Sequence, residues 1–291
     1  MTLKSAAFLG LGVMGYPMAG HLSGKTDLSV TVYNRTFAKV ENWEKQYKGS
    51  PATTPAEAVR NANLIFICVG NDHDLEQVLT GANGVIDTVR PGAIIIDHTT
   101  VSADITRRMA SLFAQRNVQF LDAPVSGGQA GAEKGALSVM VGGDKDAFET
   151  VAPVIRQAYG KEVRLIGPSG TGQTAKMLNQ ICIAATVQGL SEALAFGQKA
   201  GLNMEEVLAV ISKGAAQSWQ MENRSATMLQ GKFDFGFALD WMIKDLSIAI
   251  AEAQRHGARL PGTETILSYY QELSAQGDGR LDTSALIKRL R

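Results

Sequence analysis

The sequence predicts an α/β fold in which a doubly wound domain over residues 1–166 is followed by an all-α domain over residues 167–291, the two joined by a long helix. Up to residue 166, short β-branched runs alternate with helical patterns, and beyond it long helical patterns replace them. With 291 residues, of which 45% are hydrophobic, the chain is long enough to bury the cores of two domains.

Several of the predicted strands are apolar along their whole length, without an alternation of polar and apolar residues. This is typical of strands that are buried on both faces, and the helical patterns between them imply parallel pairing through crossover connections. The predicted strands are residues 5–10, 28–33, 64–69, 93–97, 118–122, 137–142 and 162–166.

The helical part begins with an unusually apolar helix over residues 174–201, which ends at a glycine. A helix that is apolar on most sides is expected to be buried on several sides, so we predict that it joins the domains and forms the centre of the second one. Helical patterns at residues 203–214, 240–257 and 282–290 are expected to pack around it.

Composition favours a small-molecule ligand. The formal net charge is +0, which gives no support for binding nucleic acid or an anionic membrane. No apolar run reaches the ~20 residues that cross a bilayer, and "AAFLG" leads straight into a glycine turn, so we read a strand rather than a signal peptide and expect a cytoplasmic protein. Cys68 and Cys182 are expected to be buried thiols, and no metal site is expected.

The segment "FLGLGVMG" predicts a dinucleotide site of the Rossmann type. Gly10 permits the tight turn after a strand, Gly12 lets a pyrophosphate approach the backbone, and Gly15 lets the following helix pack closely. The helix N-terminus then offers free amides to the phosphates. The complete predicted cofactor turn is Gly10, Leu11, Gly12, Val13, Met14 and Gly15.

The end of the second strand, "VYNRT", favours NADP over NAD. An acidic residue commonly binds the adenosine ribose of NAD at this place, whereas this chain has Asn34, Arg35 and Thr36. Asn34 does not repel a 2′-phosphate, Arg35 can pair with it, and Thr36 can donate a hydrogen bond. The alternative is that Arg35 is solvated and that the protein accepts either NADP or NAD.

A second glycine-rich segment, "FLDAPVSGGQAGAEKGAL", follows a strand whose carboxyl end should lie where open α/β sheets bind ligands. The Ser126 hydroxyl and the backbone amides of Gly127 and Gly128 form a pattern suited to binding a carboxylate. The alternative is a glycine-rich turn that binds nothing.

Four motifs in order, spread over essentially the whole chain, resemble those of the β-hydroxyacid dehydrogenase family. This family includes 3-hydroxyisobutyrate dehydrogenases and tartronate semialdehyde, succinic semialdehyde and glyoxylate reductases. The motifs are "FLGLGVMGYPMAGHL", "DAPVSGGQAGAEKGAL", "GPSGTGQTAKMLNQ" and "KDLSIAIAEA".

The resemblance implies hydride transfer between NADP(H) and a small carboxylate-bearing aldehyde or its β- or γ-hydroxy acid. It implies that Lys176 is catalytic and that Asn179 holds the substrate, while the turn at Ser126 binds its carboxylate. Thr100 would face the nicotinamide ribose and Val69 would line the cofactor. From the helical domain, which would complete the active site and mediate a homodimer or homotetramer, Lys244 would approach the nicotinamide.

Lys176 fits the chemistry of a proton donor. A lysine in an apolar site loses part of its preference for the charged form, and while charged it stabilises a developing alkoxide. Asn179 lies three residues further along the predicted helix and can address the same substrate. A lysine with no role, reaching solvent along the helix, is the alternative. Two other functions stay open: an imine reductase or reductive aminase, and a non-catalytic nucleotide-binding module, both of which generally lack the lysine.

Overall fold

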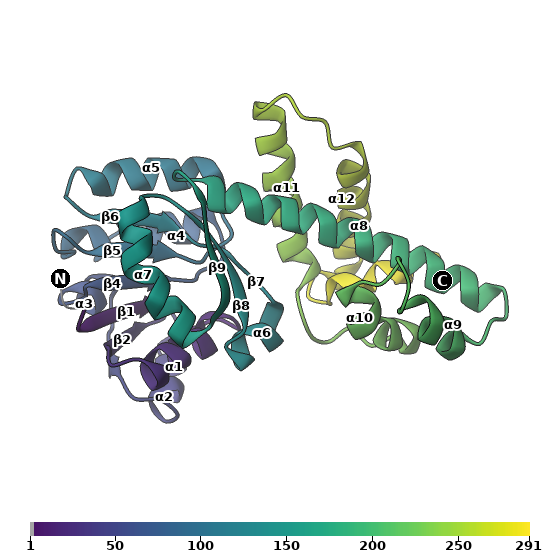
Figure 1. Ribbon diagram of the computed structural model, residues 1–291, viewed down its shortest axis with the longest axis horizontal. Helices are drawn as coiled ribbons and strands as arrows, with labels where there is room; N and C mark the ends of the chain where they lie inside the picture. The colour runs from purple at the N-terminus through teal and green to yellow at the C-terminus, as the bar shows by residue number, and fades with distance from the viewer. Residues whose placement is uncertain (1–2) are drawn as a thin grey trace. The chain divides into compact units, whose positions relative to one another are not determined.

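The computed structural model describes residues 3–291, which pack as two compact units, one ending at Lys176 and one running from Met177 to Arg291 (Figure 1). The division falls inside the long helix α8 (Thr171–Lys199), whereas the predicted domain boundary, between residues 166 and 167, precedes that helix. The domain assignment itself stays a prediction.

The first unit contains one sheet, and each of the seven predicted strands is present in it. Its strand order is β3-β2-β1-β4-β5-β6-β8-β7, with β9 paired to β8. From β3 to β6 all pairs are parallel, which is the doubly wound order, and the order reverses between β1 and β4. The strands are β1 Ser5–Leu9, β2 Ser29–Tyr33, β3 Ser50–Pro51, β4 Leu64–Ile67, β5 Ile94–Asp97, β6 Gln119–Asp122, β7 Val125–Ser126, β8 Leu137–Gly142 and β9 Gly160–Gly167.

Parallel pairing does not hold for the whole sheet. β8 runs antiparallel to both β6 and β7, and only β9 is parallel to β8. The connection between β7 and β8 contains only the short helix α6 (Gly128–Lys134), and a parallel crossover needs a dozen or more residues. The chain therefore reverses direction here, and the glycine-rich segment forms the reversal.

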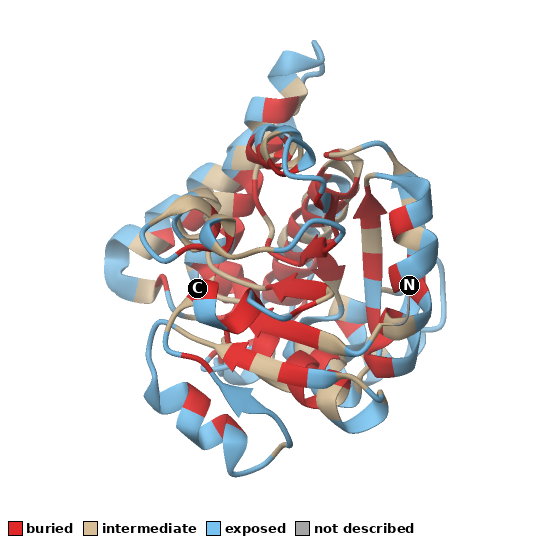
Figure 2. Ribbon diagram, turned by 90° about the vertical axis from the view of Figure 1, so that its left-hand side faces the viewer, coloured by how far each residue is buried: buried red, intermediate tan, exposed pale blue. Residues whose placement is uncertain are grey.

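Successive side chains of the strands enter two different cores. In β1, Ala6 and Phe8 face one core and Ala7 and Leu9 face the other, because side chains alternate across a strand. Figure 2 shows the strands largely buried between more exposed helices. The first core is covered by α1 (Gly15–Lys25), α2 (Ala38–Glu44) and α7 (Lys145–Ala158), and the second by α3 (Pro55–Val59), α4 (Asp72–Thr80) and α5 (Ala103–Ala114).

The second unit is helical, as predicted. Its core includes Val187, Met228, Leu246 and Tyr270. The pattern at residues 282–290 forms a 3-10 helix, and two helices that were not singled out, α10 and α12, complete the unit. Its elements after α8 are α9 Met204–Ile211, α10 Trp219–Gln230, α11 Leu239–Arg255, α12 Pro261–Leu273, a π-helical turn Ser274–Asp278 and the 3-10 helix Thr283–Leu290.

One face of α8 differs from the sequence expectation because it is exposed. Leu178 and Phe196 are 59% and 72% exposed, and Cys182, Ala185 and Gly189 between them are also exposed. Their spacing of three, four and seven residues puts them on one side of the helix. The expectation of two buried thiols was wrong, since Cys68 is half-buried and Cys182 exposed. Within residues 3–291, no helix combines the length and apolarity that crossing a membrane requires.

Candidate functional site

The predicted cofactor turn lies between β1 and α1, at the point where the strand order reverses. Gly10 has φ +101°, and a Cβ there would overlap the carbonyl oxygen of Cys68 at the end of β4. A Cβ on Gly15 would overlap the carbonyl oxygen of Gly10. A Cβ on Gly12, in contrast, would meet no protein atom within 4 Å. Two of the glycines are therefore required by packing, while the third leaves backbone open to a ligand.

The other residues of the turn differ in exposure. Leu11 is buried in the first core, so it offers only backbone groups to a ligand. Val13 is 61% exposed, and Met14 is half-buried. The backbone of the turn, rather than its side chains, is the part suited to phosphates.

Asn34 fastens this turn to the end of β2. Its Oδ1 accepts a hydrogen bond from the Leu11 amide at 2.9 Å, and its Nδ2 donates to the Thr36 carbonyl oxygen at 3.0 Å. An aspartate could accept the first bond but could not donate the second. Asn34 therefore orders the turn, a role that the sequence did not reveal, in addition to being uncharged.

Arg35 extends into solvent beside Asn34. Its side chain is 85% exposed, and its Nη1 lies 3.1 Å from Oδ1 of Asp74, which belongs to the first turn of α4. The ion pair lies at the end of β2, where the adenosine ribose was expected.

The ends of β4 and β5 are tied together beside the turn. The Val69 amide donates to Thr99 Oγ1 at 3.1 Å, and the Thr99 amide donates to Asp97 Oδ1 at 3.0 Å. Thr99 thus uses its hydroxyl to link the two strand ends. The next residue, Thr100, is half-buried.

Ser126, Gly127 and Gly128 form the reversal between β7 and α6. Ser126 ends β7 and pairs with Ser138 of β8. Gly127 and Gly128 have φ +135° and +61°, which side chains disfavour, and a Cβ on Gly128 would meet no protein atom within 4 Å. As at Gly12, a backbone group is left open at this edge of the sheet.

Asp122, at the end of β6, anchors the beginning of α8. Its Oδ1 accepts from the Gly170 amide at 2.8 Å and its Oδ2 from the Gln173 amide at 2.9 Å. Cβ atoms on Gly142 and Gly172 would lie 2.6 and 2.8 Å from these carboxylate oxygens. Within "GPSGTG", Gly172 thus makes room for the Asp122 carboxylate. Burial raises the pKa of Asp122, and the backbone hydrogen bonds oppose that effect.

Gln173 adds a second anchor that sequence reasoning missed. It is fully buried; its Nε2 donates to the Thr99 carbonyl oxygen at 2.7 Å, and its Oε1 accepts from the Val101 amide at 3.2 Å. Strands β5 and β6 together therefore fix the start of α8, which carries Lys176 one turn later, buried to 7% exposure.

Asn179 and Lys244 belong to a polar chain in the second unit. Asn179 Nδ2 donates to Gln180 Oε1 at 2.7 Å, and Gln180 Nε2 donates to Asp245 Oδ2 at 2.6 Å. Lys244 Nζ lies 3.1 Å from Asp245 Oδ1. Gln180 was missed, although its position four residues after Lys176 on a helix puts both on nearly the same side.

Two buried titratable groups, His98 and Asp97, lie near the strand ends. His98 donates from Nδ1 to the Ala123 carbonyl oxygen at 2.6 Å and accepts at Nε2 from the Tyr159 hydroxyl at 2.8 Å. Desolvation lowers its pKa to about 4, so it is neutral. Desolvation also raises the pKa of Asp97 to about 7. Across residues 3–291, no group of three or more His, Cys, Asp or Glu side chains is arranged to hold a metal ion.

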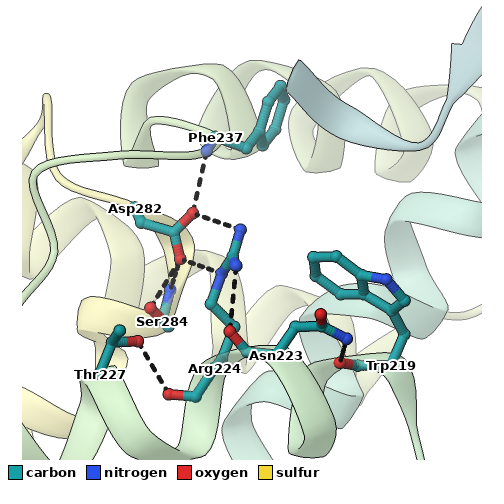
Figure 3. A network of polar contacts seen from close by, with 7 residues as sticks. All are labelled: Trp219, Asn223, Arg224, Thr227, Phe237, Asp282 and Ser284. Carbon is teal, nitrogen blue, oxygen red and sulfur yellow. Dashed lines mark hydrogen bonds and ion pairs between the residues drawn. The ribbon is translucent and has the colours of Figure 1, made fainter. Parts of the chain in front are cut away.

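An arginine clamp orders the loop before α11 (Figure 3). Asp282, 1% exposed, pairs with Arg224 Nε at 3.1 Å and accepts from the Phe237 amide at 2.9 Å. The Arg224 guanidinium lies 4.9 Å from the ring centroids of both Trp219 and Phe235, which remain partly exposed. Two neighbouring aromatic residues differ in burial, since Phe233 is in the core and Trp241 is 37% exposed.

Comparison with known proteins finds a family match for each of two successive parts of the chain. Residues 5–167 match the NAD binding domain of 6-phosphogluconate dehydrogenase. Residues 170–290 match a family described as NAD-binding of NADP-dependent 3-hydroxyisobutyrate dehydrogenase.

Individual relatives align with the chain over nearly its whole length. It is 56% identical over 288 residues to an uncharacterized oxidoreductase of Shewanella frigidimarina, covering 99% of this chain and 98% of that one. It is 36% identical to the 2-hydroxy-3-oxopropionate reductase of Escherichia coli, with 97% and 96% covered. A solved structure, Mycobacterium tuberculosis 3-hydroxyisobutyrate dehydrogenase with L-serine, superposes with a TM-score of 0.89 at 27% identity and 100% coverage of both chains. Since these matches span both units, the chain is an NAD(P)-dependent oxidoreductase and belongs to the β-hydroxyacid dehydrogenase family.

Proposed function

We propose that the protein transfers a hydride between NADP(H) and a small carboxylate-bearing aldehyde or β- or γ-hydroxy acid, with Lys176 as general acid and base. Glyoxylate and succinic, methylmalonic and tartronic semialdehydes are the candidate aldehydes. The observation that carries the proposal is a buried lysine on a helix whose start is fixed to the carboxyl ends of β5 and β6. The cofactor turn follows β1 at the same edge of the parallel sheet.

In the direction of reduction, the bound nicotinamide supplies the hydride. As the carbonyl carbon accepts it, the carbonyl oxygen becomes an alkoxide and takes a proton from the Lys176 ammonium, which later recovers a proton from water. The ammonium also stabilises the alkoxide before the transfer is complete. We assign the substrate carboxylate to the Ser126 hydroxyl and the amides of Gly127 and Gly128.

Asn179 and Lys244 are proposed to help hold the substrate and the nicotinamide. The link from Asn179 through Gln180 and Asp245 to Lys244 restrains all four side chains. A restrained amide and ammonium lose less conformational freedom when a ligand binds.

NADP is proposed as the preferred cofactor, with NAD as a second possibility. The side chains after β2 include no carboxylate: Asn34 is an amide, Arg35 a cation and Thr36 a hydroxyl. The match of residues 170–290 to a family described as NADP-dependent supports the same preference. The Val69 and Thr100 positions follow β4 and β5, where a cofactor that extends from the turn would pass.

We further propose that the chain forms a homodimer or homotetramer through its helical unit. The exposed face of α8 from Leu178 to Phe196, which is apolar apart from Glu192, supports self-association, since extended apolar faces commonly mark protein–protein interfaces. The expected cytoplasmic location stays a prediction.

Initial-rate measurements test the reaction. Each candidate aldehyde is assayed with NADPH and with NADH, and propanal and butanal serve as controls that lack the carboxylate. We expect turnover of at least one semialdehyde or glyoxylate with NADPH, and much lower kcat/KM for the controls. Turnover only of a ketone mixed with an amine would instead identify an imine reductase or reductive aminase.

A further inference from the structure

The ion pair between Arg35 and Asp74 involves the side chain that is proposed to bind the 2′-phosphate of NADP. Arg35 Nη1 and Asp74 Oδ1 are 3.1 Å apart, and the two side chains are 85% and 24% exposed. Asp74 is the more firmly held partner, because it lies in a helix and its amide donates to Asn71 Oδ1 at 2.9 Å. The guanidinium is therefore the mobile member of the pair.

We propose that Asp74 sets the nucleotide selectivity of the site, by competing with the 2′-phosphate for Arg35 and by repelling that phosphate. The inference rests on the proposed function, in that Arg35 must face the ribose. Its consequence is a site that prefers NADP only moderately and retains affinity for NAD.

The energetics of the pair favour competition. Exposed ion pairs contribute little, whereas a phosphate carries about −1.5 to −2 charges and offers three acceptor oxygens. The phosphate therefore takes over the guanidinium when NADP binds. Since α4 fixes the backbone of Asp74, its carboxylate would remain close to the phosphate, with only the Arg35 guanidinium between them. The repulsion between these two negative charges should weaken NADP binding roughly threefold to tenfold at low salt.

The same contact allows a second interpretation, in which Asp74 strengthens NADP binding instead of weakening it. If Asp74 served to orient Arg35 for the phosphate, removing its charge would weaken NADP binding. The high exposure of Arg35 argues against this reading, since one contact to a largely solvated guanidinium restricts it little.

The Asp74→Asn variant of the full chain distinguishes these readings. Its matched control is Glu76→Gln, which removes the same charge from the same helix, where Glu76 Oε1 lies 3.3 Å from Arg108 Nη1. Dissociation constants are measured by calorimetry for NADPH, NADH, 2′,5′-ADP and 5′-AMP at low salt. The measurements are repeated in about 0.5 M salt, which screens the interaction between exposed charges.

We expect Asp74→Asn to bind NADPH and 2′,5′-ADP about threefold to tenfold more tightly, with NADH and 5′-AMP unchanged and a smaller gain at high salt. Glu76→Gln should change none of the four constants. Weaker NADPH binding, no change, or an equal gain for NADH would each overturn the inference.

Arg35→Ala separates this inference from the proposed function. If it weakens NADPH far more than NADH while Asp74→Asn has no effect, the cofactor proposal stands and only the role of Asp74 fails. If Arg35→Ala lowers both affinities equally, the phosphate assignment fails, whatever Asp74→Asn does.

Discussion

Replacing Asp122 by alanine tests whether this carboxylate holds the start of α8. The change leaves the amides of Gly170 and Gln173 buried without acceptors. Each unsatisfied donor costs about 1–3 kcal/mol, and removal of a buried carboxylate offsets part of the loss. The free energy of unfolding should therefore fall by about 2–4 kcal/mol.

The assay is urea unfolding at neutral pH, with Asp144→Ala as the control. Asp144 caps α7 by accepting from the Ala147 amide at 2.9 Å, and loss of such a cap costs about 1 kcal/mol. Asp122→Ala should also lower kcat, because Lys176 loses its fixed position, while the affinity for NADPH is kept. Unfolding free energies that are the same for the two variants would refute the anchoring role.

Three further changes have distinct expected results. Asp97→Asn should gain stability relative to the wild type as pH rises from about 4 to about 7, because the raised pKa of Asp97 makes the wild-type native state lose up to about 4 kcal/mol across that window. Urea unfolding at pH 5 and pH 8 covers the upper part of the window, where the gain should be about 2–3 kcal/mol. Gly15→Ala should lower the unfolding midpoint, whereas Gly12→Ala should keep it and weaken NADPH binding in a fluorescence titration; the reverse order would refute the division of roles. Phe196→Glu should reduce the oligomer to a smaller species in size-exclusion chromatography with light scattering, and an unchanged mass would place the interface elsewhere.

The features that sequence predicted correctly have local signals. Each of the seven strands is a short apolar or β-branched run, and α8 is a single continuous helical pattern. The cofactor turn was recognisable because a tight approach to a neighbouring strand admits only glycine at Gly10 and Gly15.

The features that sequence did not reveal depend on distant residues. Asp122 and Gly170 are 48 positions apart, and Arg35 and Asp74 are 39 apart, so no periodicity links them. The direction of β8 depends on how the short connection after Ser126 folds back, which strand propensity does not encode. Likewise, an apolar pattern cannot distinguish a buried face of α8 from an exposed one.

The kcat of Lys176→Met tests the central claim most directly. Methionine fills the space of the buried lysine without a titratable group, and Lys199→Met, in the exposed last turn of the same helix, is the control. With the best aldehyde and NADPH, we predict that Lys176→Met lowers kcat by about 100-fold to 10,000-fold while NADPH still binds, and that Lys199→Met leaves kcat unchanged. Turnover by Lys176→Met at the wild-type rate would contradict the assignment of Lys176 as the general acid and base.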